Sequence, residues 1–529
     1  MNISQKGCRT NSSSNMIQDQ GVEDIEKVKL LYTDADLLDK FEIGQVLYKR
    51  YKESGNISAS VALLNELKEL KPSARFIERE LQINLDKTQL LHDSNYFVKH
   101  PNPTSQNFKI PLKVLHVLNT SIPYVKNGYS IRSKYIIENQ KKYGIEPVVL
   151  TRPGFPNDFE GGSLNSHEDL ILEWENEIPY YRCLPQMIMR YTPLRKYLKE
   201  YSEKIANVIE DEMPGIVHAA SNYVNGLAAF EATRVINIPF IYEIRGFWEL
   251  TASSKIPLFK DSEEFQLAQK METFLAYHAD QVITICRGLR DALVARGVDG
   301  DKIWIIPNGV DSGLFKPKPV NEELSAKYGT KNKFVLGYIG SITKYEGLQM
   351  LFPVMDEFKK AGYNLKLIIV GTGNYRLVLE RLVTGLNLSE EVVFVDHIHH
   401  SQVTEYYSLF DLCVFPRIDL EVTRMVTPLK PLEAMACGKP IIGSELEAIK
   451  EIITSGETGL LFDLTERDLF QKIKLLYENH HLRTKLTARA RKWVTVNRDW
   501  YKLAGTYNSL YQQMVKDRRN YFFLKRGAK

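Results

Sequence analysis

Residues 334–348 read FVLGYIGSITKYEGL, a short apolar run that ends at a glycine and a polar loop. A continuous apolar run of this length is typical of a strand in a parallel sheet that is buried on both faces. Similar runs alternate with helical stretches in two blocks, which predicts an α/β protein with two doubly wound domains facing each other across a cleft. The other runs lie at 113–118, 146–150, 215–219, 239–244, 281–285, 302–306, 365–370, 392–395, 412–415 and 440–442.

Changes in composition give the expected domain boundaries. Residues 1–21 are polar and rich in Ser and Asn, which predicts disorder. Residues 22–110 have two apolar stripes at helical spacing and a linker with Pro and Asn, which predicts a helical extension; one unit of a helical repeat is the alternative. We place the N-terminal sheet domain at 111–310 and the C-terminal one at 311–494. A C-terminal helix at 495–520 is expected to complete the first domain.

Composition narrows the class of protein and its location. The chain has 529 residues with a net charge of +4, so no overall field indicates a nucleic-acid partner. The five cysteines are scattered without a CxxC pair, which fits a reducing, cytoplasmic setting. Segments 190–204 and 516–529 mix basic and aromatic residues. They are candidates for contact with an anionic membrane surface on its inner face, and an ordinary solvated helix face is the alternative.

Residues 427–440, TPLKPLEAMACGKP, predict a helix that begins at a ligand site. Thr427 suits an N-cap and the following proline suits the first helical position, and a helix start can hold an anion. Lys430 and Glu433 are three residues apart and therefore share a helix face. A cation and a carboxylate at this place suit a nucleoside diphosphate, with Lys430 at the phosphates and Glu433 at the ribose. A surface ion pair is the alternative.

Glycine loops follow several predicted strands, where a backbone can approach a phosphate closely. Gly340 and Ser341 follow one strand, and Gly371 and Gly373 follow the next. The NAD fingerprint is not met, because Arg376 stands where a third glycine would be needed, and this disfavours a dinucleotide oxidoreductase. Plain strand-to-helix turns are the alternative. The comparable loop of the first domain contains Asn127, Gly128 and Arg132.

From about residue 113 to 514 the chain resembles the retaining GT-B glycosyltransferases of family 4, the group 1 glycosyltransferases. Four segments carry the resemblance in the family's order: ADQVIT at 279–284, PNGVD at 307–311, LEAMACGKPII at 432–442 and GETGLL at 456–461. The resemblance implies two Rossmann-like domains, a nucleotide-sugar co-substrate, and neither a cofactor nor a metal. It does not extend to residues 1–110.

The resemblance also assigns roles to single residues. Glu433 is similar to the second glutamate of the family's E-x7-E motif, which holds the donor ribose, whereas Met425 stands at the first. Ser341 and Glu346 stand where the family has a phosphate-binding arginine and lysine. Lys344, Lys430 and Arg417 are the nearest candidates to supply the missing charge. The implied donor-binding set is Gly340, Ser341, Lys344, Gly371, Gly373, His397, Ile398, Arg417, Thr427 and Leu429.

On the first domain, Arg245 aligns with a histidine of the family's catalytic region. Arginine cannot act as a base at neutral pH, but it can bind a phosphate or the acceptor. His218 ends an apolar strand, and a hydrogen-bonded core histidine is the alternative to a role at the acceptor. His397 and its neighbours, His399 and His400, lack the spacing of a metal site. The catalytic candidates are therefore Lys430, Glu433 and Arg245, and the acceptor-side candidates are Asn127, Gly128, Arg132 and His218.

The predicted function is transfer of a sugar, with retention, from a nucleotide sugar to a glycan or polyprenyl-linked acceptor in cell-surface polysaccharide or glycoconjugate synthesis. The departing phosphate would help to take the acceptor proton, so no separate general base is required. The altered positions Met425, Ser341 and Glu346 motivate one alternative, a non-catalytic GT-B protein that only binds nucleotide sugars. A sugar-nucleotide epimerase of the same shape is a further alternative.

Overall fold

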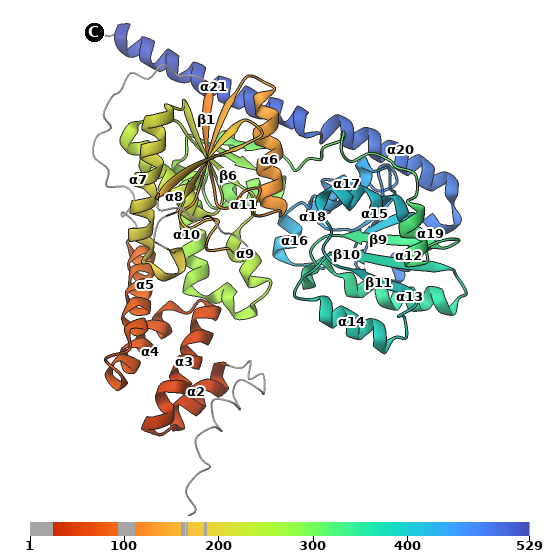
Figure 1. Ribbon diagram of the computed structural model, residues 1–529, viewed down its shortest axis with the longest axis horizontal. Helices are drawn as coiled ribbons and strands as arrows, with labels where there is room; N and C mark the ends of the chain where they lie inside the picture. The colour runs from red at the N-terminus through yellow and green to blue at the C-terminus, as the bar shows by residue number, and fades with distance from the viewer. Residues whose placement is uncertain (1–24, 94–111, 160–163, 165–167, 185–187, 528–529) are drawn as a thin grey trace, which may run out of the picture.

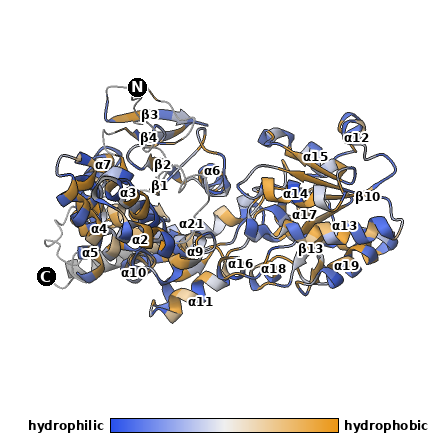
Figure 2. Ribbon diagram, turned by 90° about the horizontal axis from the view of Figure 1, so that it is seen from below, coloured by the Kyte–Doolittle hydropathy of each residue, from blue (hydrophilic) through white to orange (hydrophobic). Residues whose placement is uncertain are grey.

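The computed structural model describes residues 25–93, 112–159, 164, 168–184 and 188–527, with side chains of the last helix up to Lys516. Two sheet domains stand side by side, and a helical extension lies below the first (Figure 1). The strands are hydrophobic, whereas most surface helices show one hydrophobic and one hydrophilic face (Figure 2). The predicted disorder of residues 1–21 falls outside the described residues. Of the helices that are described, none combines the length and hydrophobicity needed to cross a membrane.

The N-domain contains an eight-stranded sheet in the order β3-β4-β2-β1-β5-β6-β7-β8. It is parallel except for β3, which pairs antiparallel with β4. The six predicted strands of this domain are present, and the hairpin β3-β4 was missed. The strands are β1 (Lys113–Leu118), β2 (Glu146–Thr151), β3 (Leu170–Glu175), β4 (Ile178–Cys183), β5 (Ile216–Ala220), β6 (Phe240–Ile244), β7 (Gln281–Thr284) and β8 (Ile303–Ile305).

Helices cover both faces of this sheet, as continuous apolar strands require. One face packs against α7, α8, α10 and α11, and the other against α6 and the C-terminal helix α21. The helices are α6 (Gly128–Lys141), α7 (Leu194–Glu212), α8 (Tyr223–Ile236), α9 (Trp248–Ser253), α10 (Glu263–His278), α11 (Arg287–Ala295) and α21 (Trp500–Gly527).

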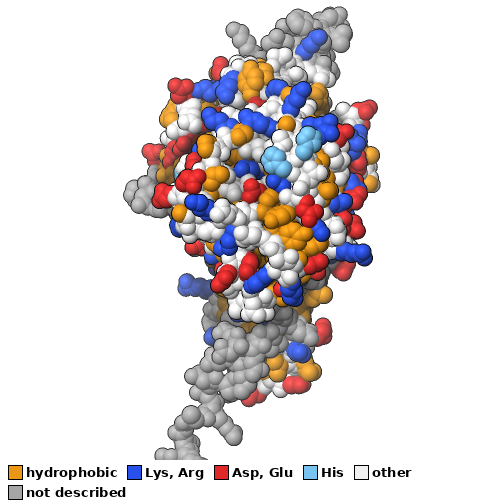
Figure 3. Space-filling model, turned by 90° about the vertical axis from the view of Figure 1, so that its right-hand side faces the viewer, with side chains coloured by type: hydrophobic (Ala, Val, Ile, Leu, Met, Phe, Trp, Pro, Cys, Tyr) orange, Lys and Arg blue, Asp and Glu red, His pale blue; other side chains and the backbone are white. Residues whose placement is uncertain are grey.

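The C-domain has a six-stranded parallel sheet in the order β11-β10-β9-β12-β13-β14. Its outer face mixes Lys and Arg with Asp and Glu, in keeping with the small net charge (Figure 3). The elements are α12 (Glu322–Tyr328), β9 (Phe334–Ile339), α13 (Leu351–Lys360), β10 (Leu365–Val370), α14 (Arg376–Gly385), β11 (Val392–Val395), α15 (Val403–Leu409), β12 (Leu412–Phe415), α16 (Glu421–Met425), α17 (Lys430–Ala436), β13 (Ile441–Ser444), α18 (Glu447–Lys450), β14 (Leu460–Phe462), α19 (Glu466–Glu478) and α20 (His480–Asn497).

The extension forms four helices around a small apolar core of its own. Gly55 and Asn56 make the turn between α3 and α4, and the Asn56 side chain caps α4 by accepting from Ala59 N at 3.0 Å. Lys87 pairs with Glu264 of α10 at 2.7 Å, which fixes the extension to the N-domain. The helices are α2 (Ile25–Asp34), α3 (Leu37–Ser54), α4 (Ile57–Leu70) and α5 (Arg75–His92).

The basic segment 190–204 contributes both to the core of the N-domain and to its surface, where Arg190 and Tyr191 are exposed. Tyr197 and Tyr201 of α7 are fully buried in the N-domain core, and Arg195 pairs with Asp86 of the extension. One face of α7 therefore packs into the N-domain, and contact of this segment with a membrane stays a prediction. The side chains of residues 517–529 lie outside the described part.

The chain crosses between the domains twice, and the two crossings are hydrogen-bonded to each other. Val310 N donates to Arg498 O at 2.8 Å, and Trp500 N donates to Val310 O at 3.2 Å. After the second crossing, α21 runs back over the N-domain (Figure 1). Trp500 and Tyr507 of α21 are buried there in the same apolar cluster as strand residues of the N-domain. The C-terminal helix thus belongs structurally to the first domain.

Arg132 of α6 holds these segments together from inside the N-domain. Its Nε lies 2.8 Å from Glu243 Oε1 at the end of β6, and both side chains are buried. The two amino groups donate to Ile306 O at 2.7 Å, to Pro307 O at 2.9 Å and to the Tyr507 hydroxyl at 2.8 Å. One guanidinium therefore joins α6, β6, the first crossing and α21.

Replacing Arg132 with methionine should lower the free energy of unfolding of the N-domain by about 3 kcal/mol, because part of the buried Glu243 charge loses its partner. Urea denaturation followed by circular dichroism measures the change. Lys141→Met is the matched control, since Lys141 pairs with the exposed Glu177 at 2.8 Å and its removal should matter far less. Equal losses in the two variants would contradict this role of Arg132.

Candidate functional site

Three loops of the C-domain meet at the carboxyl ends of β9 and β10. Gly340 has φ +150°, and a Cβ there would lie 2.1 Å from Lys430 Cε. A Cβ at Gly371 would lie 2.1 Å from Gly340 O, and one at Gly373 would lie 2.0 Å from Ile342 O. The glycines therefore let two loops pack backbone against backbone, and they leave room for the Lys430 side chain beside them.

Lys430 is held by partners on the strand and loop beneath it. Its Nζ lies 3.0 Å from Glu346 Oε1, donates a hydrogen bond to the Tyr338 hydroxyl, and stands 4.7 Å above the centre of the Tyr338 ring. Burial lowers the pKa of Lys430, and the Glu346 charge opposes that shift. The ammonium partner is Glu346 rather than Glu433, which excludes the surface ion pair considered from the sequence.

Glu346 is a buried counter-ion. Burial alone would raise its pKa, but the charges of Lys430 and Arg417 outweigh burial and leave the pKa below its ordinary value. Arg417 Nε lies 3.8 Å from Glu346 Oε2, and its Nη1 donates to Val426 O at 2.7 Å. The carboxylate at the position where the family has lysine thus serves two cations, and the group keeps a net positive charge.

Glu433 lies one turn along α17 from Lys430. The Tyr407 hydroxyl donates to its Oε2 at 3.3 Å, and burial raises the pKa of Glu433 to about 7. Its carboxyl therefore changes charge near neutral pH, in a place where it can accept hydrogen bonds from a bound hydroxyl.

The start of α17 differs from the prediction. The helix begins at Lys430 with Leu429 as N-cap, and neither Leu429 nor Thr427 caps it through a side chain. Thr427 is buried and instead accepts from Asn308 Nδ2, whose shorter bond is to Thr427 O at 2.8 Å. Because α17 has seven residues, positive charge at this place comes from Lys430 and Arg417 rather than from a helix dipole.

The other predicted donor-side residues are exposed or partly buried. Ser341, Lys344 and His397 are exposed, and Ile398 packs against the C-domain core. Within the described chain no group of three or more His, Cys, Asp and Glu side chains is placed to hold a metal ion.

Met425 does not face the glycine loops. It ends α16, which rests on the N-domain, where the Cys286 thiol donates to Met425 O at 2.6 Å and the side chain packs against the N-domain core. Gly288 permits this approach, because a Cβ there would already lie 3.3 Å from Met425 Cα. The residue at the position of the first family glutamate therefore contributes to the contact between the domains.

A cavity of about 380 Å³ opens between the domains. Most of its wall comes from N-domain loops, and the loop before α17 closes the C-domain side. Its described lining residues are Asn119, Gly128, Tyr129, Arg132, Ser221, Asn222, Arg245, Gly246, Trp248, Thr251, Ile285, Asn308, Val426, Thr427 and Leu429. Sequence reasoning found Gly128, Arg132, Arg245, Thr427 and Leu429 among them and missed the loop that precedes α8. The sequence feature that could have revealed this loop is Asn222, an asparagine suited to cap a helix, just after an apolar run.

Arg245 follows β6 and lines this cavity with a side chain that is 9% exposed. Its Nε lies 2.9 Å from Glu243 Oε1, and its Nη1 donates to Tyr129 O at 2.9 Å and to Ser133 Oγ at 2.6 Å. The guanidinium also lies 4.6 Å from the centre of the Tyr129 ring. Arg245 is therefore fixed in place on one side and faces the cavity with the other.

Two of the acceptor-side candidates, His218 and Arg132, have buried side chains. His218 is buried; its Nδ1 lies 2.7 Å from the Tyr511 hydroxyl, and its Nε2 lies 3.0 Å from Glu243 Oε2. Burial lowers the pKa of His218, so the ring is neutral, as in the core-histidine alternative. Arg132 contributes to the cavity wall, but its guanidinium is bonded to internal partners. Asn127 caps α6 by accepting from Ser130 N at 3.0 Å.

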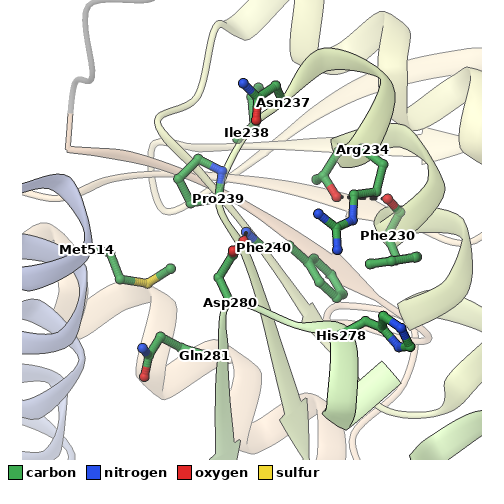
Figure 4. A pocket seen from close by; sticks show the side chains of 11 residues that line it. Phe230, Arg234, Asn237, Ile238, Pro239, Phe240, His278, Asp280, Gln281 and Met514 are labelled. Atoms are coloured by element: carbon green, nitrogen blue, oxygen red, sulfur yellow. Dashed lines mark hydrogen bonds between the residues drawn. The ribbon is translucent and has the colours of Figure 1, made fainter. Parts of the chain in front are cut away.

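A second cavity, of about 340 Å³, lies at the amino ends of β6 and β7 beside α21 (Figure 4). Ligands of doubly wound sheets bind at the opposite, carboxyl ends. Arg234 at this cavity is exposed, and Asp280 is bonded to Phe240 N at 2.7 Å. Its charged side chains do not form a cluster, and we do not assign the reaction to it.

Comparisons with known proteins find glycosyltransferase families that match both sheet domains. The model described as Glycosyltransferase Family 4 matches residues 127–314, and the model described as Glycosyl transferases group 1 matches residues 320–493. CapM of Staphylococcus aureus, a capsular polysaccharide biosynthesis glycosyltransferase, is 24% identical over 357 residues, which are 65% of this chain and 88% of CapM. N-acetyl-alpha-D-glucosaminyl L-malate synthase of Bacillus anthracis is 24% identical over 340 residues, 63% of this chain and 83% of that enzyme.

Solved structures show the same fold. Sucrose-phosphate synthase from Thermosynechococcus elongatus superposes with a TM-score of 0.62 at 21% identity, covering 77% of this chain and 99% of that one. HepE of Anabaena, solved in complex with UDP, superposes with a TM-score of 0.58 at 17% identity, covering 76% of this chain and all of that one. Two parallel-sheet domains that meet at their glycine loops define a protein of GT-B fold. The two family models match one sheet domain each, so both sheet domains of the chain are similar to the group 1 and family 4 glycosyltransferases.

Gly340→Ala should displace Lys430 and leave Glu346 short of its nearest cation. We expect the C-domain to lose about 2 kcal/mol or more, from the strained backbone and the disturbed ion pair together. Differential scanning calorimetry measures the loss. In the control Gly362→Ala, φ is also positive, at +78°, but the new Cβ would meet no described atom within 4 Å. If Gly362→Ala is as destabilised as Gly340→Ala, the contact between Gly340 and Lys430 makes no particular contribution to the stability of the C-domain.

Proposed function

We propose that the protein transfers a sugar from a nucleoside-diphosphate sugar, held by the C-domain, to an acceptor that enters from the N-domain side. The observation that carries the proposal is the placement of Lys430. Its ammonium is fixed by Glu346 and Tyr338 directly against Gly340, at the carboxyl ends of a doubly wound sheet. A cation in this position can contact a diphosphate that lies on the glycine loops.

The ligands and activities of similar proteins support a nucleotide-sugar donor and a carbohydrate product. HepE was solved with UDP and with UDP-glucose, and CapM acts in capsular polysaccharide biosynthesis. We propose the same general setting for this chain, the synthesis of a cell-surface polysaccharide or glycoconjugate on the cytoplasmic side of a membrane. Contact of segment 516–529 with that membrane stays a prediction.

The chemistry follows from the charges. Breaking the bond between the sugar and the phosphate builds negative charge on the leaving diphosphate, which Lys430 stabilises, with Arg417 behind it. Glu433 accepts hydrogen bonds from the ribose. Arg245 cannot take a proton at neutral pH, so we propose a front-face transfer with retention, in which the leaving phosphate receives the acceptor proton. The residues need no metal for this role.

The altered family positions do not favour a purely binding role. Glu346 would oppose a diphosphate if its charge were free, but Lys430 and Arg417 neutralise it. Ser341 is exposed, and Met425 packs between the domains. Turnover of a nucleotide sugar by the full chain, with and without candidate acceptors, separates the enzyme from the binding protein.

Lys430→Ala and Glu433→Gln should each weaken nucleotide-sugar binding by at least about tenfold, the effect of losing one charge-assisted contact. Isothermal titration against UDP-, GDP-, ADP- and TDP-sugars, with EDTA present, measures the affinity and identifies the base. Lys344→Ala is the control, because Lys344 is exposed and its replacement should change the affinity less than twofold. Unchanged affinity in both site variants would move the donor elsewhere.

Donor affinity should rise between pH 6 and pH 8. The Glu433 carboxyl, with a pKa of about 7, is roughly one tenth ionised at pH 6 and nine tenths ionised at pH 8. Only the ionised form can accept hydrogen bonds from both ribose hydroxyls with its two oxygens. The expected gain is up to about tenfold when the ionised form binds alone. The diphosphate diester of a nucleotide sugar does not titrate in this range. Glu433→Gln should flatten the profile, and an equally steep profile in that variant would assign the titration to another group.

A further inference from the structure

The N-domain half of the interdomain cavity carries an excess of buried positive charge. Arg132 and Arg245 both pair with Glu243 Oε1, at 2.8 and 2.9 Å, and Glu243 is completely buried. Burial alone would raise the pKa of Glu243, but the two arginines hold it well below its ordinary value, so the carboxylate is ionised. The adjacent His218 is neutral. Two cations therefore share one anion, and the cluster has a net charge of one positive unit.

Arg245 presents this excess charge to the cavity. Among the described residues no hydrogen-bond acceptor partners its Nη2, whereas Nε and Nη1 are bonded to Glu243, Tyr129 and Ser133. The side chain is nine-tenths buried, so the charge reaches solvent only through its exposed edge at the cavity. A guanidinium that is fixed on one side and has a free amino group on the other is a strong partner for a carboxylate or phosphate.

The rest of the lining also suits an anion. The described residues around this cavity include no Asp or Glu. Two long helices begin at its wall: α6 directly after Asn127, and α8 directly after Asn222. The dipoles of the two helices add positive potential on the same side as Arg245, while the first N–H groups of α8 already donate to Glu272 Oε1 and Asn222 Oδ1. Trp248, 40% exposed at the wall, offers a flat surface for a ring.

The position of this cavity separates it from the donor residues. Lys430 and Glu433 are not part of its wall, and the C-domain contributes only Val426, Thr427 and Leu429. Leu429 Cδ1 would lie 3.5 Å from a Cβ at Gly128, so the two domains already touch at the wall of this cavity, on the side of the loop that leads to Lys430. An anion at Arg245 and a diphosphate at Lys430 can therefore be bound together.

We propose that the acceptor carries an anionic group, a carboxylate or a phosphate, and that Arg245 recognises it and determines acceptor specificity. The proposal rests on the proposed function, because it assigns acceptor binding to the N-domain side of the cleft whose C-domain side holds the donor. Glu243 is the positioning residue that holds Arg245 against the wall.

The test is isothermal titration of the full-length protein with orthophosphate and with malonate, each with and without saturating nucleoside diphosphate. We expect the small anion and the nucleotide to bind together in the wild type. Arg245→Gln should weaken anion binding at least tenfold and change nucleotide affinity less than twofold. Arg234→Gln, an exposed arginine at the other cavity, is the matched control and should behave as wild type. Arg245→Lys, which keeps the charge and loses the planar fork, should bind the anion with intermediate affinity.

Several outcomes would overturn the assignment. Mutual exclusion of orthophosphate and nucleotide in the wild type would place Arg245 at the donor diphosphate. Tenfold tighter binding of a nucleotide glucuronate than of the matching nucleotide glucose, lost in Arg245→Gln, would place the anion on the donor sugar. Anion binding that survives in Arg245→Gln would remove this residue from the site. Failure of the proposed function is distinguishable, because nucleotide binding would then be absent in the titrations without small anions.

Discussion

The buried pair between Arg132 and Glu243 is the interaction on which the rest of the molecule depends. A single guanidinium inside the N-domain bonds to the end of β6, to the first crossing between the domains and to Tyr507 of the helix that follows the second crossing. Burying both charges is costly, and the geometry offsets that cost only while every donor is satisfied. The pair therefore specifies one relative placement of four segments that are distant in sequence. That placement brings the loops of the N-domain to face the C-domain.

A buried carboxylate likewise fixes the cation that we propose as ligand-binding on each side of the cleft. Glu243 holds Arg245 at the N-domain wall, and Glu346 holds Lys430 against Gly340. In each case a buried carboxylate takes one edge of the cation and leaves another edge for a ligand. A side chain held in this way loses little conformational freedom when an anion binds, which is how preorganisation raises affinity and stabilises developing charge. The cations of both walls are thus rigid parts of the scaffold rather than mobile surface groups.

The sequence predicted what depends on apolar pattern and missed what depends on burial of polar groups. Parallel strands such as β1 and β10 are continuous apolar runs, so their positions followed directly. The hairpin β3-β4 was missed because β3 lies at the sheet edge with half-exposed side chains and shows no such run. Arg132 comes after the apolar strand β1, and His218 lies in the apolar strand β5, where ligand residues are often found. Only the packing of α21 over the two side chains shows that they are buried. No local pattern in a sequence encodes a contact with a helix nearly 300 residues or more away.

At position 346 a glutamate stands where the similar family has a lysine, and Lys430 supplies a positive charge beside it. This pair shows why a single motif residue is a poor guide to activity. Read alone, Glu346 in place of a lysine suggests a lost phosphate site. In the structure its carboxylate is the partner that makes Lys430 and Arg417 tolerable side by side in a nearly buried place. A lysine at 346 would put three cations within the same few ångströms, and each would lower the pKa of the others. Position 346 and position 430 therefore form one functional unit, and the identity of either residue has meaning only with the other.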